Sequence, residues 1–111
     1  MHDRIIVIIA SAEAAKARTG AMYALNAMKH GWLADVKLVL FGPAEQLFLE
    51  DPDFQDLVRQ FMELAKTPLA CRYLSDREGT SERLRDLGLD VQFVGVPISE
   101  AIREGYLPMV W

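Results

Sequence analysis

The stretch that decides the fold is IIVII at residues 5–9, an uninterrupted run of β-branched residues. A strand of this kind is usually buried on both faces, and such strands occur mostly in parallel sheets covered by helices. Even with Ala10 added, the run is far shorter than the roughly 20 apolar residues that cross a bilayer. It therefore predicts a strand near the centre of a parallel sheet.

Helical and strand patterns alternate along the chain after this first strand. The final predicted strand contains Pro108, which cannot donate a hydrogen bond to a neighbour, so we place that strand at a sheet edge. Strict alternation predicts an α/β protein, a three-layer α/β/α sandwich with a five-stranded, mainly parallel sheet. The expected helices span residues 12–30, 43–50, 51–65, 81–87 and 99–104, and the further strands span residues 35–41, 67–73, 90–96 and 106–111.

The clearest helix signal follows Asp51 and Pro52, which read as an N-cap and a first helical residue. Apolar residues then recur at helical spacing, which predicts a helix packed with one face on the sheet. That face consists of Phe54, Leu57, Val58, Phe61, Leu64 and Ala65.

Composition narrows the class of protein. A length of 111 residues fits one domain over residues 1–111, and an apolar share of 51% hints at a buried subunit interface. A net charge of -4, without a dense Lys/Arg run, makes nucleic acid an unexpected partner. One cysteine cannot form an internal disulfide and no export-signal pattern is visible, so we expect a cytoplasmic protein that does not contact membranes.

Chemistry is expected beyond the carboxyl ends of the strands, where parallel sheets bind their ligands. Ser11 follows the first strand, and Cys71, the only strong nucleophile of this edge, ends the third. Two interpretations of Cys71 stay open, because a lone cysteine is either a small apolar core residue or a reactive thiol. Ser75 and Glu78 have the spacing of a capping box, which predicts a helical turn that aims backbone N–H groups at the cysteine.

Other chemistries fit the sequence less well. Cys71 and Arg77 have the C-x5-R spacing of cysteine phosphatases, but the intervening loop is bulky, lacks glycine and has no histidine before it. A rhodanese-like interpretation meets the same bulky loop. His2 and His30 are the only histidines, and no glycine-rich loop follows the first strand, so we expect no metal centre and no bound cofactor.

The order of these patterns resembles the DsrE/DsrF-like sulfur-relay family, which includes the TusD and YchN types. The resemblance covers nearly the whole chain. The segments that carry it are RIIVIIAS (4–11), AMYALNAMKHG (21–31), VLFGPAEQLF (39–48), TPLAC (67–71), DLGLDVQFVGV (86–96) and ISEAIREGYLPMVW (98–111).

The resemblance implies a five-stranded parallel sheet, a last strand beside the first, and assembly into homotrimers or hexamers. It also implies a sulfur carrier or sulfurtransferase in which Cys71 holds a persulfide between a donor and an acceptor protein. Arg72 or Arg77, the turn at Ser75, and Ser11 are the candidates that would line the pocket or stabilise the anion. Relatives often have a small residue after the cysteine, whereas bulky Arg72 and Tyr73 follow it here.

A competing hypothesis from a different class is a non-catalytic binding or assembly subunit with the same fold. The reactivity of Cys71 in the folded protein separates the two, because a carrier needs an accessible thiolate and a structural cysteine does not.

Overall fold

The structure, a computed structural model, describes residues 3–64 and 66–111. Ala65 and His2, which appear in the sequence predictions, lie outside the described residues. The strands and helices alternate as predicted. In chain order they are β1 (Arg4–Ile9), α1 (Ala14–Lys29), β2 (Asp35–Leu40), α2 (Pro43–Glu50), α3 (Pro52–Glu63), β3 (Leu69–Cys71), α4 (Arg72–Glu78), α5 (Ser81–Asp86), β4 (Asp90–Gln92), α6 (Gly95–Arg103) and β5 (Leu107–Val110).

The five strands form one sheet in the order β4-β3-β2-β1-β5, and every neighbouring pair is parallel. The predicted fold class is therefore confirmed. β5 lies at an edge beside β1, with Pro108 opposite Ile6, as the proline and the resemblance both indicated. β1 is an interior strand but lies one place from the edge, and β2 occupies the centre.

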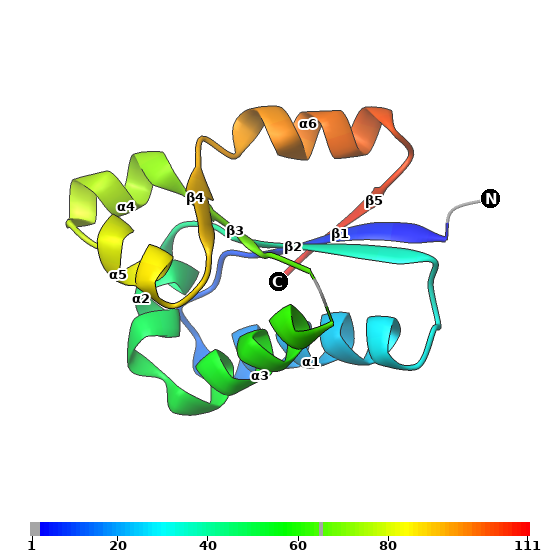
Figure 1. Cartoon of the computed structure of the whole chain (residues 1–111), viewed down its shortest axis with the longest axis horizontal. Helices are drawn as coiled ribbons and strands as arrows, with labels where there is room; N and C mark the ends of the chain where they lie inside the picture. Colours follow the sequence, from blue (N-terminus) through cyan, green and yellow to red (C-terminus); the bar gives the residue numbers. More distant parts are fainter. Residues whose placement is uncertain (1–2, 65) are drawn as a thin grey trace.

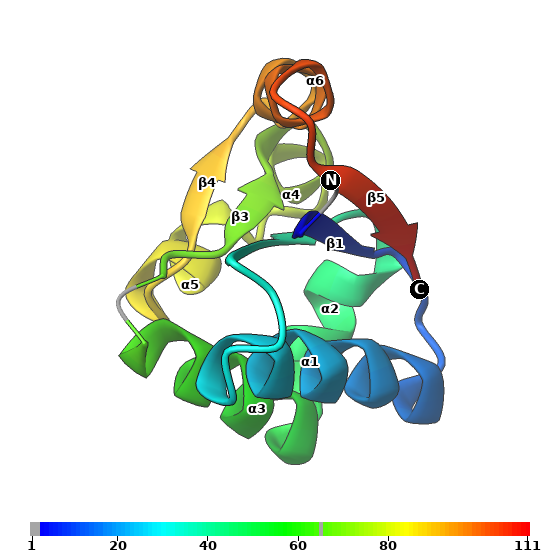
Figure 2. The ribbon, with the colours of Figure 1, turned by 90° about the vertical axis from the view of Figure 1, so that its right-hand side faces the viewer.

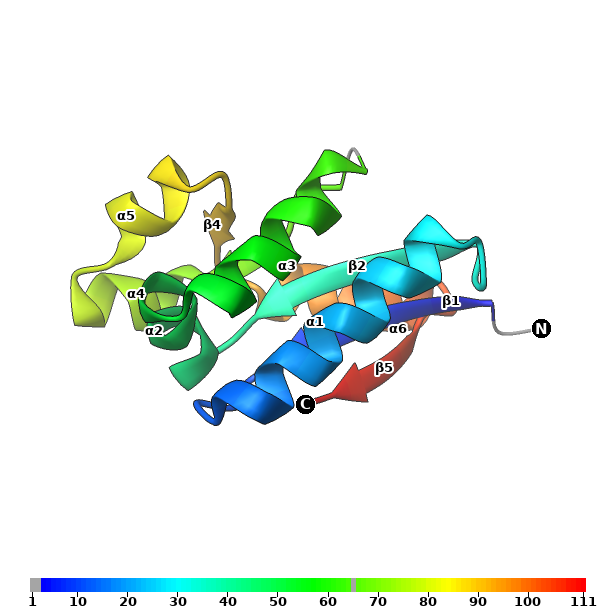
Figure 3. The same ribbon diagram turned by 90° about the horizontal axis from the view of Figure 1, so that it is seen from below.

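Helices cover both faces of the sheet. α1 and α3 pack side by side below it, and α6 crosses above it (Figures 1 and 2). α2, α4 and α5 gather at the end of the molecule where β1 and β2 terminate (Figures 1 and 3). The carboxyl ends of the strands are therefore framed by three short helices.

The apolar run of β1 supplies both cores, because successive side chains of a strand point to opposite faces. Ile5, Val7 and Ile9 lie in the larger core, which also contains buried residues of α1 and α3. Ile6 lies in a smaller core on the α6 face, which we call the α6-side cluster. Its buried members are Ile6, Val39, Cys71, Val94, Ala101 and Tyr106.

The start of α3 agrees with its sequence signal. The Asp51 carboxylate accepts a hydrogen bond from the backbone N–H of Phe54 at 2.9 Å, which is the expected N-cap contact. The same carboxylate accepts from Nε of Arg18 in α1 at 2.8 Å, and this contact lowers the pKa of Asp51. One aspartate thus begins α3 and joins it to α1.

Two predicted boundaries are wrong. The third strand was expected over residues 67–73, but β3 ends at Cys71 and α4 begins at once with Arg72. The fourth strand was expected over residues 90–96, but β4 ends at Gln92 and α6 begins at Gly95. Pro97 lies in the first turn of α6, where backbone N–H groups have no partner within the helix, so it does not interrupt it.

Candidate functional site

Cys71 is the last residue of β3 and the N-cap of α4. Its neighbour Ala70 belongs to the larger core, whereas Cys71 belongs to the α6-side cluster, as strand alternation requires. The residue is only 5% exposed. Its position at the carboxyl end of a parallel strand agrees with the sequence, but the cysteine is packed among apolar side chains.

The backbone of Cys71 contacts a side chain that the sequence analysis missed. Its N–H donates a hydrogen bond of 2.7 Å to Oε2 of Glu45 in α2. Glu45 is only 3% exposed, and burial raises the pKa of its carboxyl group from 4.5 to about 7, although the bond from Cys71 opposes the rise. A signal for its burial was available, because Glu45 precedes the buried Phe48 by three residues and shares its helix face.

Glu45 lies at a pocket of about 390 Å³, which we call the α2–α4 pocket. Gly42, Pro43, Glu45 and Gln46 line it from the start of α2. Leu74, Glu78 and Thr80 line it from α4 and the segment that follows α4. Cys71 does not line this pocket, although Leu74 contacts both the pocket and the α6-side cluster that contains Cys71.

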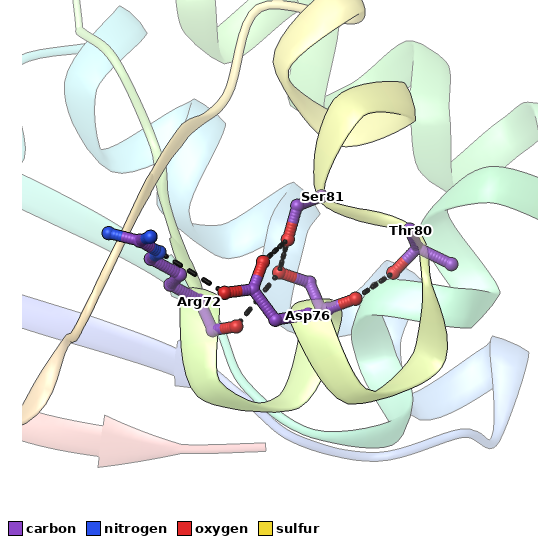
Figure 4. Close-up of polar contacts among 5 residues, drawn as sticks. Arg72, Asp76, Thr80 and Ser81 are labelled. Atoms are coloured by element: carbon purple, nitrogen blue, oxygen red, sulfur yellow. Dashed lines mark hydrogen bonds and ion pairs between the residues drawn. The ribbon is translucent and has the colours of Figure 1, made fainter.

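The two candidate arginines lie at the surface and contact neighbouring side chains. Nε of Arg72 donates to Asp76 at 3.2 Å (Figure 4). The guanidinium of Arg72 also lies 5.1 Å from the ring centroid of Phe93. The guanidinium of Arg77 lies 5.6 Å from the ring centroid of Tyr73, and Nη1 donates to the Tyr73 hydroxyl at 3.3 Å. Neither arginine lines the α2–α4 pocket.

Ser75 does not begin a helical turn, so the predicted capping box is wrong. It lies inside α4, is fully buried, and shares a hydrogen bond with the hydroxyl of Ser81. Ser81 also donates to Asp76 at 2.6 Å, which is the main cause of the lowered pKa of Asp76 (Figure 4). The hydroxyl of Thr80 donates to the backbone carbonyl of Ser75. These contacts hold the α4–α5 corner together.

Ser11 lies after the end of β1, as predicted. Its hydroxyl accepts a hydrogen bond of 3.0 Å from the backbone N–H of Glu13, just before α1. Its own N–H donates to the carbonyl oxygen of Trp111. Ser11 is not a lining residue of the α2–α4 pocket, so the structure does not bring it together with Glu45.

Two further properties concern the described residues only. Residues 3–64 and 66–111 contain no group of three or more His, Cys, Asp or Glu side chains arranged to hold a metal ion. Within the same ranges, no helix is both long and apolar enough to cross a bilayer.

The similarity of this chain to known proteins is found at the level of three-dimensional structure. No family model matches the sequence, and no curated protein matches it. Among solved structures, the chain is similar to BT1422, a conserved protein of unknown function from Bacteroides thetaiotaomicron. The identity is 23% over 98% of this chain and 95% of that chain, with a TM-score of 0.84.

The chain is also similar to the YchN protein of E. coli, with 14% identity over 97% of this chain and 99% of that chain and a TM-score of 0.76. Identities this low establish the fold and not the activity. The chain therefore has the same fold as YchN, and the fold that the resemblance implied is confirmed.

Proposed function

We propose that the protein works by binding, as a non-catalytic subunit whose ligand site is the α2–α4 pocket. One observation carries this proposal: Cys71 is 5% exposed within an apolar cluster and does not line the pocket. Cysteines that act as nucleophiles lie in partly exposed, electropositive surroundings, whereas buried structural cysteines are inert. The pocket has a size typical of small-molecule sites and lies where parallel sheets bind ligands.

The surroundings of Cys71 add support. Its backbone N–H already donates to a carboxyl group, that of Glu45. That N–H is therefore not available to an anion held at the cysteine. The positive groups that a persulfide would need, Arg72 and Arg77, contact Asp76 and Tyr73 instead.

Sulfur relay is the second candidate, favoured by the position of Cys71 at the carboxyl end of β3. In that role the Cys71 thiol loses its proton to solvent, and the thiolate attacks the outer sulfur of a persulfide donor. A new S–S bond forms on Cys71 while the S–S bond of the donor breaks, and the donor leaves as a thiolate. Arg72, Arg77, Ser11 and the Ser75 segment remain the proposed anion-stabilising groups for this reaction.

Assembly into a homotrimer or hexamer is part of both proposals. Several apolar side chains are exposed on the described surface, and such residues are common at subunit contacts. They include Phe93 after β4, Val96 in α6, and Leu107 and Val110 on the edge strand β5. These side chains are available for a contact between copies of the chain.

Intact-protein mass spectrometry after exposure to an inorganic polysulfide separates the two functions. We expect reduced wild-type protein to gain no reducible sulfur, and Cys71→Ser to give the same result, because the thiol is buried. A gain of one sulfur atom in the wild type that is absent from Cys71→Ser would establish relay and overturn the binding proposal.

Native mass spectra of the same samples are expected to show trimers or hexamers, and a monomer would contradict the assembly proposal.

A further inference from the structure

The strongest feature not yet explained is the carboxyl group of Glu45 at the α2–α4 pocket. One oxygen, Oε2, accepts from the N–H of Cys71, and Oε1 has no hydrogen-bond partner among the described residues. Among the described residues, Nε1 of Trp111 is the side-chain nitrogen or oxygen atom that is fully enclosed and has no hydrogen-bond partner, so Oε1 of Glu45 is not such an atom. Oε1 of Glu45 is therefore not fully enclosed, and Glu45 is one of the residues that line the pocket.

The charge of the pocket has one sign. Among the described residues, the titratable ones that line it are Glu45 and Glu78, and none of the described lining residues is a lysine, arginine or histidine. The other lining residues are Gly42, Pro43 and Leu74, which are apolar, and Gln46 and Thr80, which carry polar groups. A buried carboxylate without a cationic partner is costly, so a positively charged group would find both an empty hydrogen-bonding site and a favourable charge.

The other residues that line the pocket indicate which kind of cation it would bind. A divalent metal ion prefers several oxygen ligands in fixed geometry, and the described residues offer no group of three acidic, cysteine or histidine side chains for one. A pocket with apolar walls and a single deep carboxylate suits an organic cation, whose charged head pairs with the carboxylate while its stem covers the apolar side chains.

We propose that the α2–α4 pocket binds a small organic cation, with a primary ammonium or amidinium group on Glu45 and an apolar stem along Leu74 and Pro43. The inference rests on the proposed binding function and names the chemical class of its ligand. Glu78, exposed on α4 at the same pocket, adds a second and weaker attraction for the positive charge.

The test uses three probes that share one ring: benzylamine as the cation, benzyl alcohol as the neutral form and benzoate as the anion. In NMR titrations of the folded, isotope-labelled chain at pH 7.5, benzylamine is expected to shift the amide signals around residues 42–46 and of Leu74 and Thr80. Glu45→Gln is expected to weaken this binding at least tenfold, and Glu78→Gln about two- to threefold. Glu100→Gln, the same charge change on the exposed side of α6, serves as the matched control and should leave binding unchanged.

The pH dependence of benzylamine binding, which reports the protonation of Glu45, is a second measurement. Because ionised Glu45 pairs with the cation and protonated Glu45 does not, benzylamine binding to the wild type is expected to tighten about tenfold or more between pH 5.5 and 7.5. The pH dependence should be absent in Glu45→Gln.

Three outcomes would overturn the inference: equal binding of all three probes, undiminished benzylamine binding by Glu45→Gln, or shifts confined to other parts of the molecule. Equal binding of the probes at the pocket would remove the preference for a cation and leave the binding function intact. The binding function itself is tested by a different measurement, because sulfur loading on Cys71 in the mass-spectrometry experiment would contradict it.

Discussion

Replacing Glu45 by glutamine is expected to stabilise the protein at pH 8 and to change its stability much less at pH 5. Glutamine has almost the same shape and keeps an oxygen that accepts the N–H of Cys71. Unlike the carboxyl group of glutamate, the glutamine side chain does not ionise. The comparison therefore isolates the free energy of ionising one buried group.

The sign follows from the raised pKa. In the unfolded chain Glu45 ionises near 4.5, whereas in the folded chain its pKa is about 7. The stability contributed by the neutral carboxyl is fully present below pH 4.5, declines as the pH rises toward 7, and is lost above it. The difference between the two pKa values corresponds to at most about 3 kcal/mol of unfolding free energy.

Urea unfolding of both variants at pH 5, 6, 7 and 8 measures this effect. The gap between Glu45→Gln and the wild type should widen with pH, while other ionisable groups cancel in the comparison. Glu78→Gln, which removes an exposed carboxylate from the same pocket, should show no comparable widening. A constant gap across the whole pH range would mean that Glu45 is ionised in the fold at pH 5, contrary to its burial.

Replacing Gly20 by alanine is expected to cost about 1–3 kcal/mol of unfolding free energy, the usual cost of overpacking a core. A Cβ at position 20 of α1 would lie 2.6 Å from Cγ and 3.0 Å from Cβ of Trp111. The indole cannot retreat easily, because the backbone N–H of Trp111 donates to Ile8 and its carbonyl accepts from Ala10. The clash outweighs the gain of roughly 1 kcal/mol in helix propensity.

Gly95→Ala is the matched control for this substitution. Gly95 begins α6, and a Cβ there meets no atom within 4 Å. The same added methyl group should leave stability within about 0.5 kcal/mol of the wild type or raise it slightly. Chemical denaturation of both variants checks the pair, and equal stabilities would show that the Trp111 side chain can move away from α1.

The layers of the fold could be predicted because the relevant signals are local and repeated. The run at residues 5–9 requires two apolar faces, and the structure buries Ile5 in one core and Ile6 in the other. Asp51 and Pro52 define the start of α3 by capping chemistry that depends on a few neighbouring residues. Such local features form largely independently of the tertiary contacts around them.

The end of β3 could not be predicted in the same way. Two residues of β3 pair with β2 and three pair with β4, so tertiary contacts decide where the strand stops. The residues after Cys71 include Tyr73 and Leu74, which suit strands and helices alike. The direction of the cysteine side chain depends on that boundary, since a shift of one residue would turn it to the opposite face.

The part of the candidate site formed by Glu45 was missed for a different reason. A glutamate in the first turn of a helix is ordinarily an exposed residue that favours the positive end of the helix dipole. Its carboxyl group is instead buried against the end of β3, where it accepts the N–H of Cys71. The spacing to Phe48 indicates that position 45 faces the core, but a contact between residues 26 positions apart leaves no local pattern that identifies Cys71 as the partner.

The most direct test of the central claim is the rate at which Cys71 reacts with a thiol reagent at neutral pH, in native buffer and in denaturant. The account predicts a reaction at least about 100-fold slower in the native protein, limited by opening of the fold, because the side chain is buried in the α6-side cluster. A native rate close to that of the unfolded chain would show an accessible, reactive thiol. It would contradict the binding function and restore sulfur relay as the better account.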